Sequence, residues 1–588
     1  PARALARAGG LPRHLLEPAV PVPSFPLTSE PWIEVRDADV GAYRRVGITE
    51  ALTRAHRLSF DVARAGEVPV MRLLAAVYDA AAGPRDAAEW DAAWAAPALD
   101  EDRITAYLKR WEHRLDLVHP THPAFQCGEL DIETACNMGA EALNPSRLGG
   151  ASGPWFDHRL RQAEHPPFPW REAAANLLFL LAYDGAGIKR AAPGDPAENG
   201  GKVFGAATGL TAAVTHVHVE TGRSLKDLLL LSLPPQPRAP GDAPVWERDT
   251  PPAPVRERQP TGRLDILTWP ARRIRLRPDG DGMVRRVAFY DGDRLPDRTQ
   301  TLHTLRELDP MTGWGTTAKG APAPRSLTDH QSVVLPWSAA GLLREDAASP
   351  VLDHVVQAAE RGALDPGLPL RVVMSGTTYS NKHLAVISAQ PQLSTLLGTA
   401  GALARPEVRD ALARAAGTPW VFQKAMVKAV LEVTGPYLRD MVTAKLRLWD
   451  LDGAWHETIE QAADDPDAAR ARWWKALDEL MMQRLEEVPL KPTQREKARA
   501  AYRRLIAEDS ATVEERKPAR RRGRKPGAVE TFEVFGGTYT LSQISRLPQC
   551  QVSYPTLRKR VTVDGWNIEE AATTPTRRGP GPKPPVDQ

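Results

Sequence analysis

The spacing of hydrophobic residues divides the chain into two parts with different patterns. Up to residue 390, helical periodicities alternate with short apolar runs and with long loops rich in proline and glycine. Apolar side chains at three- and four-residue steps predict helices over 48–64, 68–82, 87–94, 104–115 and 170–183. Apolar and β-branched runs predict strands over 31–35, 264–269, 272–277 and 284–290, with a hairpin turn at 279–282.

Beyond residue 390 the pattern changes to long amphipathic helices separated by short polar breaks. The periodicity predicts helices over 393–404, 406–415, 418–439, 467–487 and 493–507. Short connections indicate antiparallel neighbours, so residues 391–509 are predicted to form a four-helix bundle. The whole chain is therefore predicted to be α+β, with a large mixed N-terminal domain with long loops over residues 31–390, this bundle and a small tail.

A polar segment between two apolar runs lies near the end of the mixed domain. Leu370–Met374 and Leu384–Ile387 are the apolar runs, and Ser375–His383 lies between them. This pattern predicts a β-hairpin or strand–loop–strand with a polar tip. The tip would present an amide, an ammonium and an imidazole together, from Asn381, Lys382 and His383.

The last part of the chain predicts a separate DNA-binding module. Residues 510–530 form a basic linker, and residues 531–575 predict a small hairpin, two short helices and a further turn. This order is typical of a helix-turn-helix, although a small protein-interaction domain fits it as well. Residues 576–588 are proline-rich and basic, which predicts disorder. The predicted DNA contacts of the tail are Arg520, Arg521, Arg522, Arg524, Lys525, Tyr554, Thr556, Arg558, Lys559 and Arg560.

Composition limits the functions open to the chain. The 588 residues carry a formal net charge of +3, so any nucleic-acid contact has to be local. The 3 cysteines cannot form a disulfide framework or a four-thiolate zinc site, which fits a reducing cytoplasm. No apolar run approaches the ~20 residues of a membrane span. Residues 1–30 are predicted to be a flexible leader without the apolar core of a signal peptide.

Two histidine pairs invite a metal hypothesis. His119 with His122, and His216 with His218, have no nearby Asp, Glu or Cys at a usual ligand spacing, so no metal and no cofactor is predicted. A metal hydrolase built on these four histidines stays open as a third hypothesis. No nucleophile elbow, Walker loop or dinucleotide fingerprint occurs. The chain is therefore predicted not to be an enzyme.

Glycine turns with neighbouring cations favour contact with nucleic acid. One turn follows the helix predicted over 170–183, and a second lies at Gly200–Lys202. Glycine lets a backbone approach a duplex closely, and a neighbouring cation neutralises phosphate. Ordinary surface turns would have the same sequence. The predicted contacts are Gly185, Ala186, Gly187, Lys189, Arg190 and Lys202.

Several short motifs, in one order, resemble the large subunit of the type I-E CRISPR surveillance complex, the CasA family of Cascade. They are Pro31–Val35, His122–Gln126, Leu228–Leu233, Pro244–Glu247, Asp309–Met311 with Trp314, and Tyr379–Lys382 before the helical bundle. The resemblance implies a non-catalytic cytoplasmic subunit that reads the protospacer-adjacent motif (PAM) on double-stranded DNA and wedges the duplex open for R-loop formation. It implies as partners guide RNA, target DNA, the backbone, small and guide 5′-end subunits, and a recruited helicase-nuclease.

The resemblance also gives roles to particular residues. The PAM-reading glycine loop corresponds to Gly185–Lys189, with Gly200–Lys202 as the competing segment, and Arg294 stands near the family's lysine. The wedge corresponds to Tyr379, Ser380, Asn381, Lys382 and His383, and the complex-docking loop to Trp155, Phe156 and Asp157.

The tail from about residue 517 lies outside the family pattern and resembles small DNA-binding modules that accompany HNH nucleases. It would act as a DNA clamp or be the remnant of a fused nuclease. The competing hypothesis for the whole chain is a stand-alone helix-turn-helix DNA-binding protein whose N-terminal part binds a ligand or partner.

Overall fold

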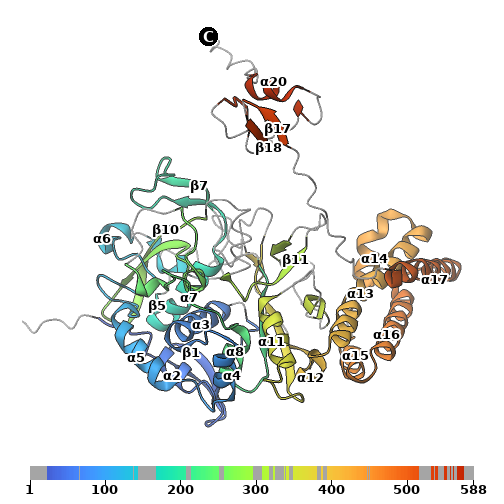
Figure 1. Cartoon of the computed structure of the whole chain (residues 1–588), viewed down its shortest axis with the longest axis horizontal. Helices are drawn as coiled ribbons and strands as arrows, with labels where there is room; N and C mark the ends of the chain where they lie inside the picture. Colours follow the sequence, from blue (N-terminus) through green and yellow to red (C-terminus); the bar gives the residue numbers. More distant parts are fainter. Residues whose placement is uncertain are drawn as a thin grey trace, which may run out of the picture. The chain divides into compact units, whose positions relative to one another are not determined.

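The computed structural model of the chain (Figure 1) describes residues 23–64, 66–136, 138–143, 167–206, 214–249, 257–295, 308–316, 322–324, 337, 340–343, 349–379, 386–388, 394–446, 448, 451–515, 531–535, 537–540, 544, 549–552, 557, 560–561 and 566–574. The chain forms two compact units, Pro1–Tyr502 and Arg503–Gln588. None of the described helices is long and apolar enough to cross a membrane.

Helices and strands alternate through most of the first unit. Its helices are α2 (Ile48–Thr53), α3 (Val68–Ala82), α4 (Ala87–Ala95), α5 (Glu101–Trp111), α6 (Ile132–Ala135), α7 (Trp170–Tyr183), α8 (Leu225–Ser232), α9 (Arg263–Leu267), α11 (Pro350–Glu360), α12 (Ala400–Leu403), α13 (Pro406–Thr434), α14 (Arg439–Lys445), α15 (Asp452–Asp464), α16 (Pro466–Glu487) and the start of α17 (Pro492–Glu515). The mixed helix and strand content agrees with the predicted class.

The strands of this unit form several small sheets. They are β1 (Ile33–Asp37), β2 (Ala42–Val46), β3 (Leu58–Ser59), β4 (Met138–Gly139), β5 (Phe168–Pro169), β6 (Gly187–Arg190), β7 (Lys202–Ala206), β8 (His216–Glu220), β9 (Arg272–Pro278), β10 (Met283–Asp291), β11 (Trp314–Thr316), β12 (Pro322–Pro324), β13 (Pro369–Ser375), β14 (Thr378–Tyr379), β15 (Val386–Ser388) and β16 (Ser394–Thr399). The sheet orders are β2-β1-β3, β4-β10-β5 with β9 on β10, and β16-β13-β8, and β6-β7, β11-β12 and β14-β15 are two-stranded.

Helix α3 lies in the core of the unit and is buried along most of its length. The charged residue Arg72 is buried as well, at 3% exposure. Its guanidinium donates to both carboxylate oxygens of Asp309 at 3.0 Å. A buried charge needs such a partner. Burial alone would raise the pKa of the Asp309 carboxyl, but the Arg72 charge and its hydrogen bond hold that pKa below its usual value. This pair ties α3 to the segment before β11.

The strand predicted over residues 264–269 is wrong, because Arg263–Leu267 is helix α9. Its first amides are capped by a distant side chain: the Asp242 carboxylate accepts from the N–H groups of Leu264 and Asp265, each at 3.0 Å. Satisfying these amides stabilises a helix start. The apolar run alone carried no sign of this cap.

The helix predicted over residues 393–404 is also wrong in its first half. Ser394–Thr399 is strand β16, which pairs antiparallel with β13. Thr395 and Leu397 are buried at a period of two, so the strand pattern prevails over the helical one. The chain therefore stays in the sheet beyond residue 390, and the long helices begin after β16.

Helix α13 is one continuous helix of 29 residues, where two helices separated at residues 416–417 were predicted. Pro419 inside it has no N–H to donate to the Ala415 carbonyl. That carbonyl instead accepts from the Trp473 indole at 2.9 Å and from the Thr418 hydroxyl at 2.7 Å. These donors satisfy the carbonyl that Pro419 leaves without its helical partner, and the Trp473 indole joins α13 to α16.

The second unit has a small core of its own. β17 (Thr531–Val534) pairs with β18 (Gly537–Thr540), as predicted, and helix α20 (Ile568–Thr573) follows. The core of this unit consists of Val534, Ile544, Val552, Leu557, Ala571 and Ala572. Most residues of the two helices predicted between them lie outside the described residues, so the helix-turn-helix stays a prediction.

Acid is expected to destabilise the first unit through His354 on α11. The ring is 4% exposed and packs edge-on against Trp90 at 4.8 Å. Burial lowers the pKa of His354 from 6.5 to about 4. Between these pH values the His354 imidazole is protonated in the unfolded chain and neutral in the folded chain. This group alone therefore lowers the free energy of unfolding by about 3 kcal/mol from pH 6.5 to pH 4, and its contribution does not grow below pH 4.

Urea unfolding followed by tryptophan fluorescence across this pH range measures the effect. His354→Leu should remove this part of the acid sensitivity, whereas His456→Leu, at an exposed position of α15, should keep it. An unchanged pH slope in His354→Leu would show that another group causes the loss.

Candidate nucleic-acid interface

The two glycine segments that competed in the sequence lie in one hairpin. Helix α7 ends at Tyr183, and after Asp184 and two further residues the chain enters β6. β6 pairs antiparallel with β7, so that Arg190 lies opposite Lys202. Gly187 has φ 122°, a backbone conformation that favours glycine at this turn. The structure therefore brings Gly185–Arg190 and Gly200–Lys202 together, and we call residues 185–206 the glycine hairpin.

The cations predicted to contact phosphate differ in their accessibility. Lys189 is 16% exposed, and its ammonium lies 2.7 Å from an Asp184 carboxylate oxygen. The Arg190 guanidinium lies 4.5 Å from the centre of the Tyr290 ring. Lys202 is exposed on β7. Of these three, Lys202 is the cation that the fold leaves open to a phosphate.

Arg294, the fourth predicted cation, also faces its own chain. Its guanidinium lies 2.7 Å from Asp291 and 2.8 Å from Asp195, and its side chain is 19% exposed. Asp195 belongs to the connection between β6 and β7. Arg294 therefore holds the glycine hairpin against the end of β10.

A run of alternating charges supports the start of the glycine hairpin. Arg272 is 2% exposed and lies 2.5 Å from Asp184 and 3.4 Å from Asp291. Its guanidinium also donates to the Gly185 carbonyl at 3.1 Å. With the pairs of Lys189 and Arg294, this makes a continuous series, which we call the charge ladder: Lys189, Asp184, Arg272, Asp291, Arg294 and Asp195.

Burial lowers the pKa of the Lys189 ammonium, while Asp184 opposes that change. Buried charges with good partners hold one geometry, because leaving any of them unpaired costs several kcal/mol. The ladder therefore presents the glycine hairpin in a fixed conformation, as a preformed binding loop requires.

Sequence reasoning missed Asp184, Arg272 and Asp291. The run of arginines at 272–277 resembles an exposed basic strand, yet Arg272, Arg273 and Arg275 are all buried. The sequence did contain one sign of this burial, the acidic pair Asp291 and Asp293 at the end of β10, which is the strand that pairs with β9. Gly292 between them has no room for a Cβ, which would lie 2.2 Å from the Ala271 backbone.

The base of the predicted wedge lies against the start of the glycine hairpin. The Tyr379 hydroxyl donates to the Tyr183 carbonyl at 2.7 Å, across 196 residues of sequence. The arms of this hairpin are β14 and β15. Leu370–Met374 is a strand, as predicted, because it lies in β13. The hairpin alternative is wrong for this strand, since β13 pairs with β8 and β16. Ser380, Asn381, Lys382 and His383 lie outside the described residues.

The glycine hairpin also exposes two large apolar side chains that the sequence did not single out. Ile188 on β6 is 61% exposed and Phe204 on β7 is 58% exposed. Apolar side chains on an exposed two-stranded ribbon mark a contact surface more often than isolated ones do. In the pairing of β6 with β7, both side chains belong to residues close to Lys202.

The two histidine pairs lie in different surroundings. His119 caps a turn through its Nδ1, which accepts from the His122 N–H at 3.0 Å. His216 and His218 are buried on β8, and burial lowers the pKa of His218 to about 3. Within the described ranges, no three His, Cys, Asp or Glu side chains lie close enough together to hold a metal ion.

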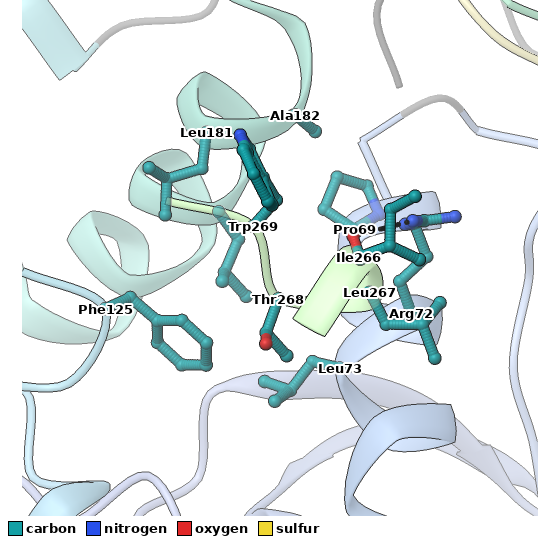
Figure 2. Close-up of a pocket in the computed structure, with 11 residues that line it drawn as sticks. Pro69, Arg72, Leu73, Phe125, Leu181, Ala182, Ile266, Leu267, Thr268 and Trp269 are labelled. Atoms are coloured by element: carbon teal, nitrogen blue, oxygen red, sulfur yellow. Dashed lines mark hydrogen bonds between the residues drawn. The ribbon is translucent and has the colours of Figure 1, made fainter. Parts of the chain in front are cut away.

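A cavity beside α3, α7 and α9 is too small for a substrate (Figure 2). Its volume is about 50 Å³, and Phe125, Leu181 and Trp269 make its lining mainly apolar. Small-molecule sites usually measure roughly 300 Å³ or more. This cavity therefore has no room for a ligand of that size.

Comparison with known families settles the relationship of the chain. The sequence model of the family described as CRISPR-associated protein Cse1 matches residues 26–521. The chain belongs to this family. The resemblance to the large subunit of the type I-E surveillance complex is thereby confirmed.

Individual Cse1 proteins agree with this relationship. CasA/Cse1 of Thermus thermophilus is 31% identical over 366 residues, which are 60% of this chain and 66%, just under two thirds, of that protein. The crystal structure of Thermobifida fusca Cse1 matches with a TM-score of 0.68 at 22% identity, over 84% of this chain and 98% of that one. A chain of a CRISPR RNA-guided surveillance complex matches with a TM-score of 0.60 at 18% identity, over 84% and 99%. At these identities the structures show that the fold is shared.

Other predicted contacts of this Cse1 protein are mostly outside the described residues. These are Trp155, Phe156 and Asp157 of the docking loop, and Arg520, Arg521, Arg522, Arg524, Lys525, Tyr554, Thr556, Arg558 and Lys559 of the tail. Arg560 is described, and its guanidinium donates to the Ala571 and Thr574 carbonyls at 3.0 and 2.5 Å and lies over the Trp566 ring. Arg560 therefore caps the C-terminal end of α20. This position gives no support to its predicted role as a DNA contact.

Proposed function

We propose that this chain is the large, non-catalytic subunit of an RNA-guided surveillance complex in the cytoplasm. It would recognise the PAM on double-stranded DNA through the glycine hairpin. The wedge at residues 379–383 would then separate the strands, so that guide RNA can pair with one of them. The long helices α13, α15, α16 and α17 would act as the bundle that contacts neighbouring subunits, and the complex would recruit a helicase-nuclease.

One observation carries this proposal: the Tyr379 hydroxyl lies 2.7 Å from the Tyr183 carbonyl. Motif reading and strand opening must act on adjacent base pairs, so the two elements have to lie side by side. Sequence gives no reason for residues 183 and 379 to meet. A glycine turn that approaches a groove and a side-chain wedge that enters the stack are compatible parts of a minor-groove site.

Lys202 is expected to contribute one phosphate contact. In the assembled complex, Lys202→Ala should weaken binding to duplex DNA by about tenfold and lower the slope of log affinity against log salt by about 1. Filter binding at several salt concentrations measures both quantities. Lys109→Ala, at an exposed position of α5, should leave them unchanged. If the salt slope of Lys202→Ala equals that of the wild type, Lys202 does not contact phosphate.

Purification from cells tests the function as a whole. The chain is expected to copurify with a short RNA and with other protein subunits. If it copurifies with no RNA while residues 516–588 alone bind a specific duplex, the stand-alone helix-turn-helix hypothesis is the correct one.

A further inference from the structure

One face of the glycine hairpin combines a cation with two apolar side chains, and all three are exposed. On β7, Lys202 and Phe204 are exposed, whereas Val203 between them is 3% exposed. Alternate residues of a strand point to opposite faces, so Lys202 and Phe204 share the outer face. On β6, Lys189 pairs with Val203. The preceding residue, Ile188, is therefore the cross-strand neighbour of Phe204, and it is 61% exposed.

The exposure of Phe204 is unusual for this chain. Figure 1 shows β7 in a ribbon at the margin of the first unit. The Phe204 ring is 58% exposed, whereas the other phenylalanines that the structure describes are buried or half-buried. The register of the ribbon shifts beside Ile188, between Gly187 and Lys189. Such irregularities redirect side chains and are frequent next to functional sites. Two neighbouring apolar side chains presented in this way indicate a surface that a ligand covers.

The charges of the hairpin favour nucleic acid as that ligand. The two acidic side chains between β6 and β7 have partners within the same chain. Asp195 pairs with Arg294 at 2.8 Å, and the Glu198 carboxylate accepts from the Gly201 N–H at 3.0 Å. The outer face therefore presents the positive charge of Lys202 beside two apolar side chains. A cation for phosphate next to a ring for bases is the combination that nucleic-acid sites use.

The turn that leads into β7 is narrow and open. The Asn199 N–H donates to the Lys202 carbonyl at 2.8 Å, around a two-residue turn in which Gly200 and Gly201 have φ 60° and 77°. A Cβ at either glycine would have no atom within 4 Å, so the turn is free to approach a groove. Phe204 lies about 7 Å along the strand from Lys202, and the minor groove is about 6 Å wide. With Lys202 on a phosphate at the rim, the Phe204 ring reaches the base edges.

We propose that Phe204 is an intercalating residue. Its ring enters from the minor groove between two base pairs of the motif, while Lys202 binds a phosphate at the rim and Ile188 extends the apolar contact. Minor-groove proteins insert phenylalanine or isoleucine between base steps in this way and partly unstack them. This assignment rests on the proposed function and adds to it a side chain that unstacks the motif before guide RNA pairs with the target.

The experiment uses the assembled complex with a guide that does not match the duplex, so that no R-loop forms. 2-Aminopurine, whose fluorescence rises when it is unstacked, replaces one base at a time in and next to the motif. The wild type should raise the fluorescence at one base step of the motif-bearing duplex. Phe204→Ser should abolish that rise and weaken binding by about tenfold, because a base–aromatic stack is lost. Phe204→Leu keeps an apolar side chain for insertion and should retain most of the rise.

Tyr43→Ser is the matched control, because Tyr43 is an aromatic residue with 67% exposure on β2. It should leave fluorescence and affinity unchanged. Wild-type fluorescence in Phe204→Ser, or an equal loss in Tyr43→Ser, would overturn the intercalation. So would loss of a subunit from the Phe204→Ser complex in native mass spectrometry, since the surface would then be a contact with a partner protein.

Two outcomes of the wild-type complex separate this inference from the proposed function. If the wild type prefers the motif-bearing duplex but raises the fluorescence at no base step, the intercalation is wrong and the proposed function stands. If the wild type binds motif-bearing and motif-free duplexes equally, the proposed function has failed, and the intercalation fails with it.

Discussion

Asp184→Ala is expected to lower the free energy of unfolding by about 3–5 kcal/mol, since it leaves buried charges without their partner. Arg272, at 2% exposure, would keep Asp291 at 3.4 Å and would lose its closest carboxylate. Lys189 would lose the same partner at 2.7 Å. The glycine hairpin would lose its fixed geometry, so duplex binding by the assembled complex should fall at least tenfold. Urea unfolding and filter binding measure the two effects.

Two comparison variants separate the ladder from a general loss of charge. Asp91→Asn removes one partner of an exposed pair, Arg361–Asp91, and should change stability by less than about 1 kcal/mol. The double variant Asp184→Ala with Arg272→Met should recover part of the stability lost by Asp184→Ala, because it removes a buried charge that has lost its closest partner. If Asp184→Ala is no more damaging than Asp91→Asn, the ladder does not support the hairpin.

Asn381→Ala combined with Lys382→Ala is expected to reduce stable R-loop formation by about 10- to 100-fold, since separating one stacked base pair costs a few kcal/mol that the wedge would supply. Assembly of the complex should stay intact, because the prediction assigns these residues to the tip and not to the hairpin stem. Gel-shift analysis of the R-loop with a matched target measures the product. Native mass spectrometry checks the composition of the complex. Unchanged strand opening would show that the wedge is misplaced.

The segments of the candidate site were chosen from local patterns. Glycines beside cations indicated the two turns, and the polar run after Leu370–Met374 indicated the proposed wedge. Short-range patterns of this kind do not reveal which segments meet. The pairing of β6 with β7, which joined the two glycine turns, and the contact of Tyr379 with Tyr183 are tertiary.

Several features that local patterns did not reveal depend on a side chain that is distant in the sequence. Asp242 caps α9 where the apolar run favoured a strand. Trp473 supplies the donor that Pro419 lacks, so α13 continues. Asp184 and Asp291 neutralise Arg272, so a basic strand is buried. Each partner lies far away in the sequence, where periodicity carries no information about it.

The most direct test of the central claim is strand opening by the wild-type complex on two matched duplexes that differ only in the motif beside the target. We expect 2-aminopurine fluorescence next to the motif to rise rapidly on the motif-bearing duplex. On the duplex without the motif it should stay at the closed level. Equal opening of both duplexes, or of neither, would contradict a subunit that reads the motif and opens the DNA.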